Sequence, residues 1–294
     1  MHSKKTFFAA AMAAMLALPA FAQTKKAPTK QTGKVIFFDD FSTGKLDRTK
    51  WTPIVTGFHT NGELQAYVDS ANVISFAKGA AAEGASNGAL VLSPRYSPGF
   101  KTFDNQTFDF ISGRITTVNK FDFTYGTAEA RIKVVAADGL WPAWWMLGYP
   151  EWPAGGETDI MEFIGEADWV SAAVHGPGYS GETPFVNRLY MPKNNDATKW
   201  HTYAVEWTPD ALNFKYDGVL MFRVTKTMAE HYGKWIFNDK QYLLLNFAVG
   251  GIYPYKINQI KKPYYGLSEK ALDLIKTNKA KMLVDWVRVT QNSK

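Results

Sequence analysis

Three acidic residues fall close together in one otherwise apolar stretch of the sequence. Glu157, Asp159 and Glu162 follow Gly155-Gly156, and only Thr158 and the pair Ile160-Met161 separate them. In a β-strand, Glu157 and Asp159 share one face, whereas strict alternation places Glu162 on the other. One extra residue, a β-bulge at Ile160-Met161, returns Glu162 to the face of the first two. The spacing therefore predicts a bulged strand that presents three carboxyl groups together.

Carboxyl groups gathered in this way suit acid–base chemistry on a glycosidic bond. Like charges a few ångströms apart raise at least one pKa, so that one carboxyl stays protonated near neutral pH. Glycoside hydrolysis needs this division, with one carboxylic acid protonating the leaving oxygen and one carboxylate attacking the anomeric carbon. Retention of configuration requires the two groups roughly 5 to 5.5 Å apart. Taken alone, the three acids equally fit a calcium site or a solvated strand face.

Tryptophans just before the acids favour a carbohydrate site. Trp141, Trp144 and Trp145 lie just before the acidic strand, and Trp152 almost adjoins it. Sugar rings present apolar C–H faces that stack on aromatic planes and leave their hydroxyl groups to polar side chains. On a strand, Trp141 and Trp145 share a face that Trp144 opposes. We expect one set to line a cleft and the other to enter the core.

The rest of the chain reads as β-structure around this strand. Short runs rich in Val, Ile, Phe, Tyr and Trp recur between turn signals, and Asp217-Gly218 between two alternating runs is the strongest hairpin signal. The sequence predicts one surface helix over 267–278, with Ser268 as its N-cap and Leu272 and Ile275 on one face. Strands at this spacing without intervening helices favour an antiparallel sandwich or barrel. About 260 residues fit a single large β-sandwich.

The N-terminal segment is typical of an exported protein. Lys4 and Lys5, an apolar run over 7–18 and the Ala20-Phe21-Ala22 site resemble a cleaved signal peptide. We expect residues 1–22 to be the signal peptide, 23–34 a polar linker and 35–294 one domain. The protein should therefore be secreted or periplasmic, in a bacterium, with no membrane attachment after cleavage.

Charge and cysteine content exclude several other classes. Six of the 33 basic residues and none of the 27 acidic ones lie in the first 34 positions, so the remaining body has no net charge. A nucleic-acid-binding protein would show basic clustering in its folded body, so we expect no nucleic-acid partner. The absence of cysteine excludes disulfide and zinc–thiolate scaffolds.

The acidic strand resembles the E-x-D-x-x-E signature of glycoside hydrolase family 16, in its bulged, laminarinase-like form. Further segments are similar to laminarinases in the expected order; they lie at 61–65, 112–115, 125–133, 141–148, 175–181, 201–207 and 284–289. The resemblance implies an all-β fold, a β-jelly-roll of two curved antiparallel sheets with a concave substrate cleft. It also implies retaining endo-hydrolysis of β-1,3-glucan, with no cofactor for catalysis and a β-glucan polysaccharide as the substrate. We expect the protein to be a monomer.

The resemblance also implies a role for individual residues. Glu157 would be the nucleophile, Glu162 the acid/base, and Asp159 would hydrogen-bond the nucleophile and tune both pKa values. Trp152 would stack on the sugar next to the scissile bond. The glycone subsites or the catalytic centre would be lined by Trp141, Trp145, Asn61, Glu63, Arg114 and His175. Many relatives carry a structural calcium, whose ligands here would be Asp40, the Gly88 carbonyl and Asp285.

Departures from the family pattern keep the substrate open. Thr158 replaces a usual aliphatic residue, Ile252 replaces an aromatic residue after Gly250-Gly251, and the stretch 253–281 is longer than typical. If that stretch borders the cleft, it changes which glucan is accepted, so mixed β-1,3/1,4-glucan is a further candidate substrate. A galactan hydrolase acting on agar or carrageenan and a non-catalytic β-glucan-binding protein are the alternatives on the same fold.

Overall fold

The computed structural model describes residues 33–57 and 60–291. The predicted signal peptide lies outside the described residues, and the first strand begins at Lys34, the last residue of the predicted linker. The described residues all belong to one compact unit. Within the described residues, no helix is both long and apolar enough to cross a bilayer.

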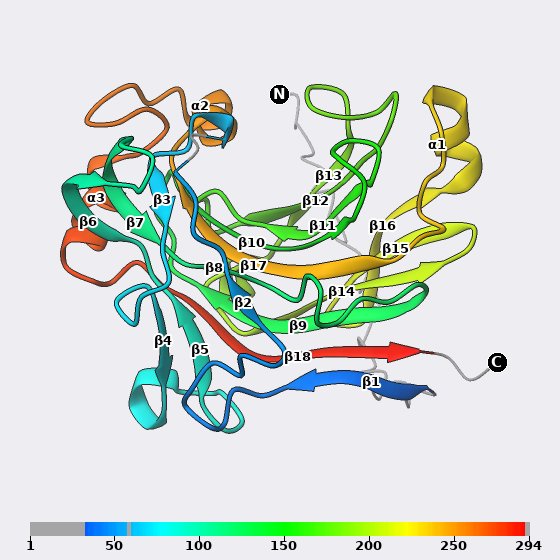
Figure 1. The fold of residues 1–294 in the computed structure, drawn as a ribbon, viewed down its shortest axis with the longest axis horizontal. Helices are drawn as coiled ribbons and strands as arrows, with labels where there is room; N and C mark the ends of the chain where they lie inside the picture. Colours follow the sequence, from blue (N-terminus) through cyan, green and yellow to red (C-terminus); the bar gives the residue numbers. More distant parts are fainter. Residues whose placement is uncertain (1–32, 58–59, 292–294) are drawn as a thin grey trace, which may run out of the picture. The chain divides into compact units, whose positions relative to one another are not determined.

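Two large sheets and one small sheet make up the fold (Figure 1). The larger sheet has eight strands, in the order β16 (Val219–Thr225), β15 (Ala211–Tyr216), β14 (His201–Thr208), β9 (Gly126–Val134), β18 (Met282–Gln291), β5 (Ala89–Leu92) and β4 (Ile74–Ala77), with β1 (Lys34–Asp39) also pairing with β18. The second has seven, in the order β13 (Phe185–Tyr190), β12 (Trp169–His175), β11 (Glu157–Glu162), β10 (Leu140–Gly148), β17 (Gln241–Val249), β8 (Arg114–Thr116) and β2 (Thr52–Pro53). The small sheet contains β3 (Gln65–Tyr67), β7 (Thr107–Ser112) and β6 (Arg95–Lys101).

Both large sheets are antiparallel throughout, which confirms the predicted jelly-roll of two antiparallel sheets. Alternation along the strands supplies the core between them. In β10, Trp144 and Met146 are fully buried among residues of both sheets, whereas Trp145, on the opposite face, is only half-buried. In β17, Leu243, Leu245 and Phe247 belong to the same core, so this strand pattern fixes which face of β10 and β17 remains for a site.

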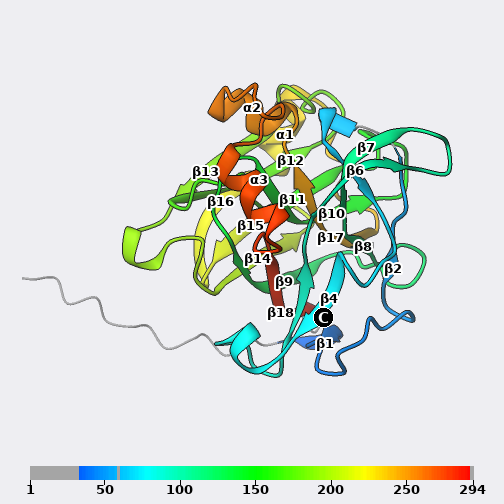
Figure 2. The same cartoon turned by 90° about the vertical axis from the view of Figure 1, so that its left-hand side faces the viewer.

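The turn and helix predictions are confirmed in part. Asp217 and Gly218 join β15 to β16 with φ of 48° and 79°, as a two-residue hairpin of this twist requires. The predicted surface helix is α3 (Glu269–Lys276), in which Ser268 caps the first turn and Leu272 and Ile275 are buried. Two short helices were not predicted, α1 (Lys226–Tyr232) and α2 (Ile252–Asn258). Figure 2 shows α2 and α3 together with the loops beside them.

Candidate active site

Strand β11 carries the bulge that the sequence predicts. Against β10, Met161 pairs with Trp144 and Asp159 pairs with Trp145, so that Ile160 is the extra residue. The pairing with β12 shifts between Asp159 and Glu162 as well. Both Ile160 and Met161 are fully buried in the core. The bulge therefore buries two consecutive apolar residues and returns Glu162 to the face of Glu157 and Asp159, which we call the carboxylate face.

The register of the seven-stranded sheet places the three acids in three parallel rows. Directly paired residues in antiparallel strands point to the same face. The row of Glu162 consists of Arg114, Asn246, Ala143, Glu162, Ser171 and Arg188. The row of Asp159 contains Leu244, Trp145, Asp159, Ala173 and Val186, and that of Glu157 contains Tyr242, Leu147, Glu157 and His175. Each row runs across the strands of the sheet.

Two glycines let the chain enter β11 at close quarters. A Cβ on Gly155 would lie 2.3 Å from the carbonyl oxygen of Pro150, and one on Gly156 would lie 2.0 Å from the Ile236 side chain. Gly156 also has a φ of 74°, which favours glycine. The Gly155-Gly156 pair thus places Glu157 at the start of the strand, directly under the loop that carries Trp152.

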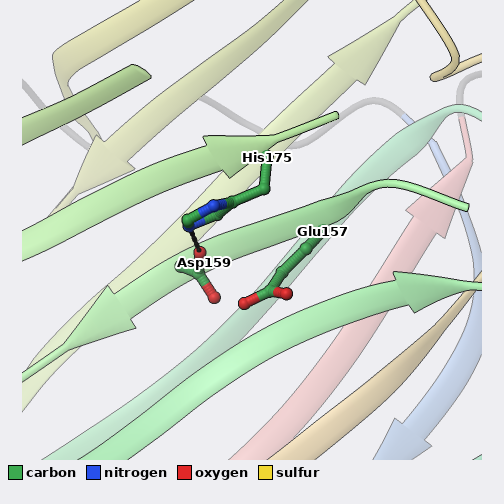
Figure 3. A group of neighbouring side chains, drawn as sticks. All are labelled: Glu157, Asp159 and His175. Atoms are coloured by element: carbon green, nitrogen blue, oxygen red, sulfur yellow. Dashed lines mark ion pairs between the residues drawn. The ribbon is translucent and has the colours of Figure 1, made fainter. Parts of the chain in front are cut away.

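Glu157, Asp159 and His175 form the centre of the site (Figure 3). His175 comes from the neighbouring strand β12, and its Nε2 atom lies 3.4 Å from Oδ2 of Asp159. Asp159 hydrogen-bonds Glu157 through their side chains. Asp159 is almost completely buried, whereas Glu157 and His175 are partly accessible. The deeper carboxyl therefore supports the more accessible one, which can reach a substrate.

Burial determines the charge state of these carboxyl groups. It is the main reason that the pKa of Glu157 is raised to about 8, and the negative charge of Asp159 raises it further. Burial also raises the pKa of Asp159 well above its ordinary value, with the charge of Glu162 next in importance. The pair therefore holds a proton at neutral pH. In the form of the pair that carries the proton on Asp159, Glu157 is a carboxylate that can act as a nucleophile.

The environment of Glu162 suits a group that donates and accepts a proton. Burial raises its pKa to about 7, while a hydrogen bond from Trp141 opposes the shift. The Trp141 indole Nε1 lies 3.0 Å from Oε1 of Glu162. A carboxyl group with a pKa near neutrality gives up and regains a proton readily at that pH, which suits a general acid and base.

The predicted glycone residues lie on the β17 and β8 side of the acids. Trp145 donates a 2.7 Å hydrogen bond to Asn246 Oδ1, and the Arg114 guanidinium lies 4.8 Å from the centre of the Trp145 ring. The charge of Arg114 also acts on Glu63, and Asn61 hydrogen-bonds Glu63. The structure therefore brings four predicted residues, Trp145, Arg114, Glu63 and Asn61, into one connected group beside β11.

Glu63 is a buried carboxyl group within this set of residues. Its Oε2 accepts hydrogen bonds from Gln65 Nε2 at 2.7 Å and from the Tyr67 hydroxyl at 3.3 Å. Burial raises the pKa of Glu63, while Gln65 and the positive charge of Arg114 lower it. Glu63 in turn contributes to the raised pKa of Glu162, which shows that the glycone residues and the acid/base carboxyl share one electrostatic environment.

Trp152 stands at the other catalytic carboxyl. The residue is 48% exposed, the centre of its ring lies 6.1 Å from that of His175, and its side chain hydrogen-bonds Glu157. Glu157 and Glu162 thus each accept a hydrogen bond from one tryptophan, Glu157 from Trp152 and Glu162 from Trp141. The exposed face of Trp152 is available to stack on a sugar ring.

The predicted calcium ligands do not form an open cation site. Both carboxylate oxygens of Asp285 are occupied, by the Ser86 backbone N–H at 2.7 Å and by Arg131 at 2.6 Å. Asp40 accepts hydrogen bonds from Ser42 and Asn87. The third predicted ligand is the Gly88 carbonyl. Arg131 already supplies the positive charge that buried Asp285 requires. The set therefore does not fit a calcium site, and the prediction that Asp40, Gly88 and Asp285 hold the ion is not supported.

One group of side chains in the described part of the chain is close enough to share a metal ion, namely Glu157, Asp159 and His175, whose ligand atoms lie within 4.8 Å of one another. The direct Asp159–Glu157 and Asp159–His175 contacts give these groups partners among themselves. We assign them to acid–base chemistry for that reason.

Sequence reasoning did not find several supporting residues. Asn246, which holds Trp145, is the one polar residue in the apolar run of β17, and this signal would have identified it. Tyr253 on α2 lies against Trp141, with ring centres 5.4 Å apart. No local sequence pattern identifies Tyr253 as a site residue, because α2 reaches the carboxylate face only through the tertiary fold.

Comparison with known proteins agrees with this geometry. A family model described as "Glycosyl hydrolases family 16" matches residues 74–249. Among curated proteins, glucan endo-1,3-beta-glucosidase A1 of Niallia circulans is 30% identical over 87% of this chain, and a beta-glucanase of Rhodothermus marinus is 28% identical over 87%. The chain spans 37% of the length of the first relative and 84% of the second.

Solved structures share the fold over nearly the whole described chain. An endo-beta-1,3-glucanase from Pyrococcus furiosus superposes with a TM-score of 0.76 at 32% identity, covering 89% of this chain and 95% of the other. The laminarinase catalytic domain from Thermotoga maritima gives a TM-score of 0.73 at 30% identity, covering 90% of this chain and all of the other.

Proposed function

Since the chain belongs to glycosyl hydrolase family 16, we propose that it is a retaining endo-β-1,3-glucanase that cleaves laminarin-type or mixed-linkage β-glucan. The observation that carries this proposal is the bulge in β11, which gathers Glu157, Asp159 and Glu162 on one face. The endo-1,3-glucanase relatives at 30% and 32% identity support the substrate class.

The proposed reaction is a double displacement. In the first step, the Glu157 carboxylate attacks the anomeric carbon while Glu162 donates its proton to the leaving glycosidic oxygen. This forms a covalent glycosyl–enzyme bond and releases the acceptor end of the chain. In the second step, Glu162 removes a proton from a water molecule, which attacks the same carbon and releases Glu157.

The supporting residues prepare each carboxyl for its step. Asp159 lies near His175 and hydrogen-bonds Glu157, so it is the second site for the proton of this pair, and Glu157 is anionic when that proton is on Asp159. The Trp141 N–H fixes one oxygen of Glu162 and leaves the other for the glycosidic oxygen. Both steps use carboxyl groups alone and require no catalytic cofactor.

Substrate and stereochemistry are tested in two assays. A reducing-sugar assay with laminarin, barley glucan, lichenan, agarose and carrageenan should give activity on the glucans and none on the galactans. Proton NMR of the first products should show the β-anomer before mutarotation. Activity confined to agarose or carrageenan would transfer the proposal to a galactan hydrolase, and binding to laminarin without cleavage would favour a glucan-binding protein.

We also propose that the protein is exported, on the strength of the signal-like sequence at residues 1–22. Expression of the full chain should yield a mature protein that begins after Ala22 outside the cytoplasm. An intact N-terminus retained inside the cell would contradict this.

A further inference from the structure

Helix α2 places one side chain against the residue that holds the acid/base carboxyl. Tyr253 packs edge-to-face on Trp141, with ring centres 5.4 Å apart and planes at 71°. Its hydroxyl lies 3.1 Å from Oγ of Ser171. Ser171 is the β12 partner of Glu162 in the register of the sheet. Glu162 contacts Trp141, Trp141 contacts Tyr253, and Tyr253 contacts Ser171. Ser171 is again the neighbour of Glu162 across the β11–β12 pair, so the four residues form a closed ring of contacts.

This arrangement adds a directional restraint to an indole that is already packed on its apolar neighbours. Trp141 is the second residue of β10, and its side chain packs in a small apolar cluster with Ile164, Trp169 and Ala248, flanked by Tyr253 and Ile257. An edge-to-face aromatic contact restrains the plane of the ring more than a general apolar contact does. The Ser171 hydroxyl restrains Tyr253 in turn. Rotation of the Trp141 ring would require both contacts to break.

Helix α2 is itself held firmly at both ends. Just before the helix, the Gly251 N–H donates a hydrogen bond to the Tyr265 carbonyl at 3.0 Å. At the end of the helix, Asn258 Nδ2 donates a hydrogen bond to the Gly266 carbonyl at 3.0 Å. Lys256 forms an ion pair with Glu182 in the segment between β12 and β13. Tyr253 is therefore presented by an element that has its own attachments to the rest of the fold.

We propose that Tyr253 is a positioning residue for Glu162, because it holds the Trp141 indole where the N–H reaches the Glu162 carboxyl. The inference rests on the proposed function, in which Glu162 is the acid/base. It also gives a role to the stretch 253–281, because Tyr253 lies in that stretch and contacts Trp141.

Several charged or titratable groups surround Glu162, so pH effects must be interpreted with all of them in view; they are Glu157, Asp159, Glu63, His175, Tyr216 and Tyr253. A readout that isolates proton donation is therefore preferable to a pH profile alone. The leaving group of an aryl glycoside provides one, because a good leaving group departs without protonation and a poor one requires it.

The decisive variant is Tyr253→Leu, which keeps the site apolar but removes both the ring edge and the hydroxyl. With a 4-methoxyphenyl β-1,3-linked glucobioside, we expect kcat/KM for glycosylation to fall about tenfold, the effect of one hydrogen bond to a charged group. With the 2,4-dinitrophenyl glycoside of the same sugar, the loss should stay below about twofold. Tyr253→Phe keeps the ring and should recover most of the lost activity.

Two controls separate positioning from general damage to the helix. Tyr255→Leu, on the same helix but stacked on Tyr265 at 4.2 Å, should show no dependence on the leaving group. In a Trp141→Phe background, Tyr253→Leu should cause no further leaving-group-dependent loss, because the two residues act in series. Equal losses with both leaving groups, or additive losses in that background, would overturn the proposal. Failure of the wild type to cleave any glucan would instead contradict the proposed function.

Discussion

The indole Nε1 of Trp141 donates a 3.0 Å hydrogen bond to Oε1 of Glu162, from a strand that pairs directly with the catalytic strand. The bond favours the charged form of Glu162, while burial favours the neutral form. The balance leaves the pKa of Glu162 at about 7. The contact therefore helps to hold the proposed acid/base in position and opposes the effect of burial on its pKa.

The first prediction concerns the alkaline limb of activity. Because Glu162 must be protonated to act as the acid, kcat/KM should decline above a pH of about 7, where Glu162 loses its proton. Trp141→Phe removes the bond that lowers this pKa, so the limb should move to higher pH by about half to one unit. Profiles with a soluble β-1,3-glucan oligosaccharide test this, and a shift to lower pH would contradict the assignment.

The second prediction is that removing the nucleophile stabilises the fold. The pKa of Glu157 rises from 4.5 to about 8 on burial, so the folded protein binds this proton more tightly than the unfolded chain does. The stability that this proton contributes is complete below about pH 4.5 and is lost as the pH rises towards 8. Glu157→Gln should therefore raise the free energy of unfolding by about 1 to 3 kcal/mol at pH 8. It should bring no gain at pH 4, and urea unfolding at the two pH values gives the comparison.

The third prediction separates the two roles of Trp152. The ring is exposed for stacking, and its side chain hydrogen-bonds Glu157. Trp152→Phe keeps an aromatic face and loses the N–H, so kcat should fall about three- to tenfold with little change in KM. Trp152→Ala loses both and should also raise KM for the glucan. Steady-state kinetics on one oligosaccharide series show whether the two effects separate; a rise in KM for Trp152→Phe equal to that of Trp152→Ala would contradict this division.

The fourth prediction concerns the buried Asp285. Its side chain is fully buried and pairs with Arg131 at 2.6 Å. Arg131→Met leaves this carboxylate without its counter-charge and should destabilise the protein by about 3 to 5 kcal/mol. A chelator should leave the melting temperature of the wild type unchanged, because Arg131 and Ser86 already occupy the carboxylate. A chelator-induced drop in melting temperature would show that a metal ion contributes here.

The catalytic strand could be predicted from sequence because its information is local. Glu157, Asp159 and Glu162 lie within one strand, and the conflict between alternation and the apolar pair Ile160-Met161 has one simple solution, a bulge. The same applies to Trp144 and Trp145, whose opposite faces follow from strand geometry. Local patterns therefore gave the chemistry and the orientation of the site.

Contacts made across the fold could not be predicted in the same way. The expected calcium ligands Asp40 and Asp285 were identified by position, but their partners Asn87 and Arg131 come from distant strands and loops. Tyr253 reaches Trp141 only because α2 folds over the end of β10. Side chains that act through a tertiary contact have no period or spacing in the sequence that would reveal them.

The central claim is that Glu157 forms the covalent bond to the sugar. A 2-deoxy-2-fluoro β-1,3-glucobiosyl fluoride should inactivate the enzyme and trap this intermediate, and mass spectrometry of the digested protein should place the label on Glu157. Azide should restore activity to Glu157→Gly and give the α-glycosyl azide. A label on Glu162 or Asp159, or release of the α-anomer as the first product of the wild type, would contradict the account.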